Sequence, residues 1–105
     1  MRVVVIGAGE VGFDVARILA QEQHDVSVID DDPAVIQRVQ ENLDVMAVHG
    51  SGTSAAILEE AGIRQADMLI AVTAIDEVNI IACMMADRLD VPTTIARTRS
   101  DELTR

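Results

Sequence analysis

The chain has 105 residues, half of them hydrophobic and one aromatic, and its formal net charge at pH 7 is −10. The length fits one domain, which we expect to span residues 1–105, and the hydrophobic fraction is sufficient for a buried core. The acidic excess argues against nucleic-acid binding, which depends on Lys and Arg, and against direct binding to anionic lipid. No apolar run reaches the roughly 18 residues of a membrane span, and no signal peptide precedes the first predicted strand. The single cysteine, Cys83, excludes an internal disulfide and fits a reducing cytoplasm.

The first predicted strand, residues 2–6, leads into a glycine motif and a predicted helix over about 10–22. The motif reads Gly7-Ala8-Gly9-Glu10-Val11-Gly12. Its first glycine allows a sharp turn, its second lets the backbone approach a pyrophosphate, and its third lets the helix pack closely on the strand. The N–H groups at the start of the helix would face the phosphates. A purely structural turn would explain Gly7 and Gly12 but would give no reason for Gly9.

The second predicted strand, about 26–30, ends in Asp30, eighteen residues after the last glycine of the motif. A strand, a glycine motif, a helix and an acid at this distance together predict a dinucleotide-binding βαβ unit. We expect Asp30 to bind the adenosine ribose and to repel a 2′-phosphate, so that NAD or NADH is preferred over NADP. In the alternative interpretation Asp30 is a solvated strand end. Asp31 follows in the same loop and is included in the candidate site, and Asp32 is expected to cap the second helix, about 33–42.

The third predicted strand, about 44–48, is followed by a loop that contains Gly50 and Ser51. This loop is interpreted either as an approach to the adenosine or as an ordinary flexible turn. The helix after it is expected to end at Gly62, because glycine is favoured just beyond the last turn of a helix.

The fourth predicted strand, residues 68–72, is apolar on both faces, as expected of a central parallel strand. Thr73 and Ala74 follow it and would lie beside the bound ligand. Either Thr73 or Asp76 is expected to cap the fourth helix, which continues to about Leu89.

The fifth predicted strand, about 94–99, carries two arginines on one side, Arg97 and Arg99. Arg97 would lie near the distal half of a bound dinucleotide. The alternative, a solvated strand end, is favoured more for Arg99. Residues 100–102 have the pattern of a further helix start.

Five strands joined by crossover helices predict an α/β fold, a Rossmann-like doubly wound parallel sheet with the order 3-2-1-4-5. The usual version of this sheet has a sixth strand, so we expect a domain that is truncated before that strand. With Phe13 as the one aromatic residue, a base or nicotinamide would be held by aliphatic walls. His24, His49 and Cys83 show no metal-ligand spacing, and no catalytic residue is predicted.

The fourth predicted helix carries apolar residues on its outward side. By helical periodicity Ile75, Val78, Ile81, Ala82, Met85, Ala86 and Leu89 are expected on the sheet. Ile80 and Met84 then lie opposite them, among charged residues. This pair predicts a subunit contact in a homodimer or a higher ring.

Beyond the glycine motif, six stretches carry a family resemblance: Val28-Ile29-Asp30, Gly50-Ser51-Gly52-Thr53, Glu60-Ala61-Gly62, residues 66–73, Asp76-Glu77-Val78-Asn79 and residues 95–100. With them the chain resembles the N-terminal nucleotide-binding domain of Trk-type potassium-uptake regulators, the KTN or regulator-of-potassium-conductance (RCK) family. The resemblance covers essentially the whole chain.

The resemblance implies a cytoplasmic regulatory subunit, not an enzyme, that controls a membrane potassium transporter or channel and associates with the inner membrane through that partner. It implies NAD or NADH as ligand, or ATP or ADP in some members, and assembly through dimers into rings. The matching ligand-binding residues are Gly7, Ala8, Gly9, Glu10, Val11, Asp30, Thr73, Ala74 and Arg97. ATP-preferring members often have an arginine inside the glycine motif, and Glu10 at that place favours NAD or NADH. The alternative function is the cofactor-binding domain of an NAD-dependent oxidoreductase.

Overall fold

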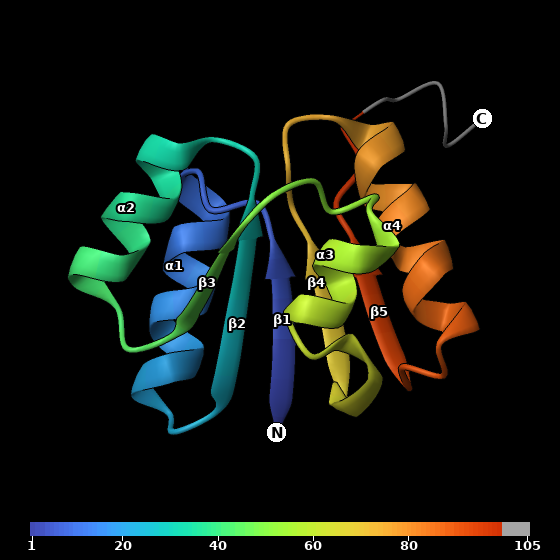
Figure 1. Ribbon diagram of the computed structural model, residues 1–105, viewed down its shortest axis with the longest axis horizontal. Coiled ribbons are helices and arrows are strands. Elements are labelled where there is room, and N and C mark those ends of the chain that lie inside the picture. Colours follow the sequence, from blue (N-terminus) through green and yellow to red (C-terminus); the bar gives the residue numbers. More distant parts are fainter. Residues whose placement is uncertain (100–105) are drawn as a thin grey trace.

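The computed structural model describes residues 1–99 and contains one parallel sheet of five strands in the order β3-β2-β1-β4-β5 (Figure 1). The strands are β1 (Arg2–Ile6), β2 (Asp25–Asp30), β3 (Met46–His49), β4 (Met68–Ala71) and β5 (Thr93–Ala96). The helices are α1 (Glu10–Gln21), α2 (Pro33–Asn42), α3 (Ala55–Glu60), a 3-10 turn (Ile63–Gln65) and α4 (Asp76–Arg88). The doubly wound fold and its strand order are confirmed. The further helix start predicted at 100–102 lies outside the described residues.

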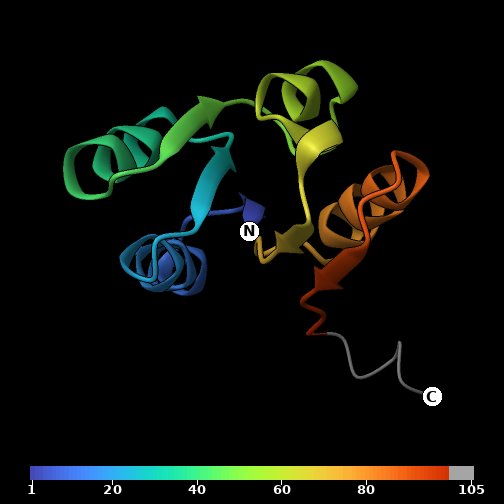
Figure 2. The same ribbon diagram turned by 90° about the horizontal axis from the view of Figure 1, so that it is seen from below.

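The two faces of the sheet carry separate apolar clusters, because side chains alternate along each strand. Val3 and Val5 of β1 face α1 and α2, and Val4 and Ile6 of the same strand face α3 and α4. Figure 2 shows α1 and α2 on one side of the sheet and α3 and α4 on the other. Right-handed crossovers require this division, because the chain leaves β1 in one direction and later returns to form β4 and β5 in the other.

Local signals place most helix ends where the sequence predicts them. The Asp32 carboxylate accepts a hydrogen bond from the Ala34 N–H at 2.9 Å and caps α2. The Ser54 hydroxyl caps α3, and Gly62, at a φ of 83°, takes the left-handed conformation that ends this helical segment.

The predicted N-cap of α4 is wrong, and its predicted buried face is right only in part. Four residues expected on the sheet pack there, namely Ala82, Met85, Ala86 and Leu89, whereas Ile75 and Ile81 are exposed. The N-cap of α4 is Ile75, without a side-chain cap, in place of Thr73 or Asp76. Asn79, Ala82 and Ala86 form its buried face. The two alanines allow close contact with the sheet, and hydrogen bonds draw Asn79 inward. The helix is therefore rotated relative to the prediction.

The rotation changes which apolar side chains of α4 are exposed. Ile75 and Ile81, which we expected on the sheet, are 54% and 45% exposed. Met84 is 59% exposed, as expected, whereas Ile80 is only partly exposed. We refer to Ile80, Ile81 and Met84 as the outer patch of α4.

Candidate nucleotide-binding site

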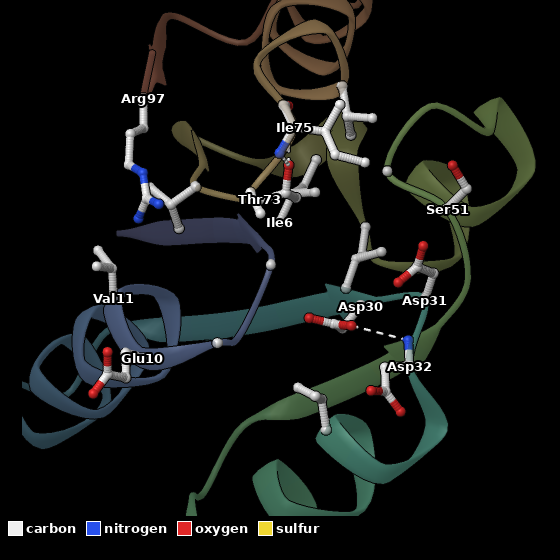
Figure 3. A pocket seen from close by; sticks show the side chains of 18 of the residues that line it. Ile6, Glu10, Val11, Asp30, Asp31, Asp32, Ser51, Thr73, Ile75 and Arg97 are labelled. Carbon is white, nitrogen blue, oxygen red and sulfur yellow. Dashed lines mark hydrogen bonds between the residues drawn. The ribbon is translucent and has the colours of Figure 1, made fainter. Parts of the chain in front are cut away.

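A pocket of about 490 Å³ opens at the carboxyl ends of the strands, where the chain directions from β1 and β4 diverge. This is the place where doubly wound sheets bind ligands, and the volume is in the range of small-molecule sites. Figure 3 shows Asp30 and Asp31 on the β2 side of the pocket and Arg97 entering from the β5 side. The pocket therefore joins segments from both halves of the sheet.

Most of the residues predicted from sequence line this pocket. They are Gly7, Gly9, Glu10, Val11, Asp30, Asp31, Gly50, Ser51, Thr73, Ala74 and Arg97. Two predicted residues do not line it. Ala8 is buried and supports the pocket through its N–H group, and Gly12 is buried against the turn after β1.

Glycine is present at the three positions of the motif for different structural reasons. Gly7 has a φ of +92°, a backbone conformation that residues with a side chain rarely adopt. A Cβ on Gly12 would lie 1.7 Å from the carbonyl oxygen of Gly7. Gly9 has a φ of −66°, and a Cβ there would meet nothing within 4 Å. The fold therefore requires glycine at two of the positions. At the third no steric contact requires it: glycine is acceptable as the N-cap of α1, and its missing side chain leaves room for a ligand.

The Asp30 side chain is held in place by the backbone around it. One carboxylate oxygen accepts from the Ala8 N–H at 2.8 Å and the other from the Asp32 N–H at 2.9 Å (Figure 3 draws the second bond). A carboxylate can accept about four hydrogen bonds, so each oxygen retains capacity for a ligand hydroxyl. This arrangement suits the two hydroxyls of a ribose.

Most charges in the pocket are separated by sign. Asp30 ends β2 and Asp31 and Asp32 follow it, whereas Arg97 and Arg99 follow β5. Glu10, at the start of α1, is a further carboxylate in the lining. Both arginines line the pocket. The strand predicted to carry them ends earlier than expected, at Ala96, so strand alternation does not explain their position. A ligand with hydroxyl groups at one end and anionic groups toward the other fits this distribution.

The loop after β3 is packed against the fold. A Cβ on Gly50 would lie 2.5 Å from Ile57, and one on Gly52 would lie 2.4 Å from Ile6. The Ser51 hydroxyl is 2.8 Å from that of Thr53. Of the two interpretations from sequence, the loop therefore fits a wall of the pocket better than an ordinary flexible turn.

The β4–α4 loop is fixed by Asn79, which is fully buried. Its side-chain oxygen accepts from the N–H and the hydroxyl of Thr73, at 2.9 and 2.8 Å. Its amide nitrogen donates to the carbonyl oxygens of Thr73 and Arg97, at 3.1 and 2.9 Å. Two segments that line the pocket thus share one buried side chain.

Sequence reasoning did not assign several pocket residues: Ile6, Ile29, Asp32, Val35, Gly52, Val72, Ile75, Val78 and Arg99. Six of them are aliphatic and form the apolar walls that the shortage of aromatics led us to expect. Ile6 and Ile29 could have been found, because they lie at the carboxyl ends of β1 and β2. Ile75 and Val78 were not predicted in the pocket because helical periodicity placed them on the sheet face of α4.

The histidine and cysteine side chains do not form a metal site or a second reactive site in the described part of the chain. Within residues 1–99 no group of three or more His, Cys, Asp or Glu is placed to hold a metal ion. The exposed His49 ring donates to the Asp31 carbonyl oxygen at 3.0 Å. Burial raises the pKa of the Cys83 thiol, and a hydrogen bond with Thr94 opposes this effect only in part. A thiol with a raised pKa is a poor nucleophile.

Comparison with known proteins agrees with this geometry. The family model of the TrkA-N domain matches residues 3–105. The chain is 52% identical over 101 residues to the Trk system potassium uptake protein TrkA of Azorhizobium caulinodans, covering 95% of the chain and 22% of that protein. The chain thus spans about a fifth of the length of this relative.

Two solved structures share the fold. The Kef CTD of Shewanella denitrificans in its AMP-bound form superposes with a TM-score of 0.77 at 21% identity, over 90% of this chain and 57% of the other. The GsuK channel bound to NAD superposes with a TM-score of 0.74 at 22% identity, over 88% of this chain and 17% of the other. At these identities the structures support the fold alone, whereas the sequence match is decisive: the chain belongs to the TrkA-N domain family.

Proposed function

We propose that this chain is a regulatory domain that binds NAD or NADH in the pocket and has no enzymatic activity. The observation that carries the proposal is Gly9, whose missing side chain no contact within the protein explains. Asp30 supports it, because a carboxylate held by two backbone N–H groups is positioned for a sugar.

The residues present fit a dinucleotide. Gly7, Gly9 and the first N–H groups of α1 would hold the pyrophosphate, because the positive end of a helix dipole attracts anions. Asp30 would bind the adenosine ribose and disfavour a 2′-phosphate. The wall at Gly50 and Ser51 would cover the adenosine, and Thr73, Ala74 and Arg97 would contact the distal half.

The related folds support an adenine nucleotide, since one is described with NAD and another with AMP. ATP or ADP is the alternative ligand. Glu10 favours the dinucleotide, because a carboxylate at the start of α1 repels the additional charge of a terminal phosphate.

The relative from Azorhizobium caulinodans, a Trk system potassium uptake protein, supports a role in potassium uptake. We infer that the domain is cytoplasmic and peripheral to the inner membrane, where it controls a membrane potassium transporter or channel. None of the helices within residues 1–99 has the length and apolar character of a membrane-crossing segment. Nucleotide-dependent coupling of about 1–3 kcal/mol would change the activity of the partner about 5- to 150-fold.

Isothermal titration with NADH tests the ligand, with NADPH as the comparison and Asp30→Ala as the variant. Saturable binding that the variant abolishes supports the proposal, and no heat of binding with NADH, NAD, ATP or ADP refutes it. The oxidoreductase alternative is tested by adding hydride acceptors to the NADH complex. Turnover in that assay would refute the regulatory assignment.

The outer patch of α4 is proposed as the contact of a homodimer or ring. Two of its residues, Ile81 and Met84, are largely exposed, although scattered exposed apolar residues alone are common. Replacing Ile80 and Met84 together by Asp is expected to lower the sedimenting mass. An unchanged mass would refute this contact.

A further inference from the structure

Among residues 1–99, Asn79 is the one polar residue that is buried, with no exposed surface. Burying a polar side chain costs free energy unless all of its hydrogen-bonding groups are satisfied. The Asn79 side chain makes four hydrogen bonds, and all of its partner atoms belong to Thr73 and Arg97. An apolar residue here would pack against the sheet, so the polar side chain indicates a positioning role.

The four bonds connect three segments. Thr73 lies in the β4–α4 loop, Arg97 directly follows β5, and Asn79 lies in the second turn of α4. A second connection lies one turn earlier, where the Asp76 carboxylate accepts from the Arg99 N–H at 3.0 and 3.1 Å. The loop and the end of β5 are thus both attached to the first two turns of α4.

Asn79 acts behind the pocket rather than within it. Thr73, Arg97 and Arg99 line the pocket, whereas Asn79 and Asp76 do not. A bound nucleotide would therefore contact the residues that Asn79 holds, without touching Asn79 itself. Any displacement of the loop or of Arg97 would change the geometry of bonds that originate on α4.

The far side of the same helix carries the outer patch. Ile80 and Ile81 directly follow Asn79 in sequence, and Met84 lies about one turn further along. An α-helix of 13 residues moves as a unit over this distance, and shifts of 1–2 Å in interface helices are a known form of switching. The distance from the buried amide to the outer patch is the width of one helix.

We propose that Asn79 is the positioning residue that couples occupancy of the nucleotide pocket to helix α4 and its outer patch. This inference rests on the proposed function, because it requires a nucleotide in the pocket. It adds the route by which that nucleotide is sensed. Asp30 and the glycine motif would hold the ligand on the β1–β2 side of the pocket. Asn79 would connect the opposite side of the pocket to α4, so that ligand binding changes α4.

Hydrogen–deuterium exchange with and without saturating NADH tests the coupling. In the wild-type chain we expect slower exchange at two places, residues 7–13 of the glycine motif and residues 76–84 of α4. The expected slowing in α4 is about fivefold or more, the lower range of typical coupling. In Asn79→Ala the slowing at residues 7–13 is retained, and that in α4 is lost.

Two further variants separate positioning from loss of stability. Asn79→Asp has the same shape but lacks the amide donors for the carbonyl oxygens of Thr73 and Arg97, so it should also lose the response of α4. Val39→Ala removes buried methyl groups on α2, away from the network, and should retain both responses although it is destabilised. If Asn79→Ala does not fold, Asn79→Asp and Asn79→Ser are compared in its place.

The outcomes are distinguishable. If NADH does not bind the wild-type chain, the proposed function fails and the coupling fails with it. If NADH binds and slows exchange at residues 7–13 but not in α4, the coupling alone is refuted. Retention of the α4 response in the Asn79 variants refutes the role of Asn79. Loss of that response in Val39→Ala also refutes it, because general destabilisation would then suffice.

Discussion

The two halves of the pocket are built in different ways. The first half, formed by the glycine motif and Asp30, consists mainly of backbone N–H groups and of space where a side chain is absent. The second half, formed by Thr73 and Arg97, is fixed from behind by the Asn79 side chain, whose hydrogen bonds are complete without a ligand. One half leaves bonding capacity free, and the other uses it internally.

This difference suggests a division of labour. Affinity should come mainly from the first half, because its open surface at Gly9 and the free lone pairs of Asp30 are available to a ligand. Response should come from the second half, because its bonds extend to a helix with an exposed apolar surface. Substitutions at the open positions of the first half, Gly9 and Asp30, should then change binding, and those in the second half should change stability or conformation.

Gly12→Ala should have the largest effect and should act on folding. The new Cβ would lie 1.7 Å from the Gly7 carbonyl oxygen, which the turn after β1 holds in place. The gain in helix propensity of about 1 kcal/mol is smaller than the cost of overpacking. We expect the free energy of unfolding to fall by about 3 kcal/mol, measured by urea denaturation. A stable Gly12→Ala chain would show that the close contact is not required.

Gly9→Ala separates binding from folding within the same motif. Its Cβ meets nothing in the protein, and alanine at an N-cap costs about 1 kcal/mol or less relative to glycine. We expect NADH affinity to fall about 100-fold, equivalent to about 2.8 kcal/mol, because the methyl group would occupy the place of the pyrophosphate. Titration calorimetry and urea denaturation are run on the same sample. An unchanged NADH affinity in Gly9→Ala would show that the glycine motif does not bind the pyrophosphate.

Asp30→Asn should lower NADH affinity about tenfold, because hydrogen bonds to a charged acceptor contribute about 1.5 kcal/mol or more. It should also bring the affinities for NADH and NADPH closer together, since the repulsion of the 2′-phosphate is removed. Asp32→Asn is the matched control. It removes the same charge from the pocket lining, and asparagine caps helices as well as aspartate does. Equal losses in both variants would attribute the effect to charge alone.

The first half could be predicted from the sequence because its features are local. Gly7, Gly9, Gly12 and Asp30 belong to one βαβ unit, and each has a specific backbone or ligand requirement. The strand order could be predicted as well, because crossover handedness leaves few alternatives. The packing of Gly50 against Ile57 could not, because it depends on the position of α3.

The second half could not be predicted because its determinants are distant in sequence and polar. Apolar periodicity placed Ile75 and Ile81 on the sheet and left no role for Asn79. The buried amide of Asn79 gains its partners only when the ends of β4 and β5 lie side by side. One of these partners, Arg97, is 18 residues from Asn79 in the sequence. Two small alanines on the same face then allow α4 to approach the sheet.

Thr73→Val should have the smallest effect and is the sharpest test of the division. Valine retains the shape of threonine but loses the hydroxyl that donates to Asn79 and accepts from the Ile75 N–H. The Thr73 N–H still donates to Asn79, so the network is weakened rather than broken. We expect a loss of about 1 kcal/mol in the free energy of unfolding, with NADH affinity reduced less than about threefold.

Thr73→Ser makes the opposite change: it keeps the hydroxyl and removes the methyl group, so it is the control for Thr73→Val. If Thr73→Val lowers NADH affinity as much as Gly9→Ala does, the hydroxyl binds the nucleotide directly and both halves contribute affinity. The proposed division would then be wrong. If only stability falls and Thr73→Ser restores it, the hydroxyl serves the protein, and the second half holds α4 rather than the ligand.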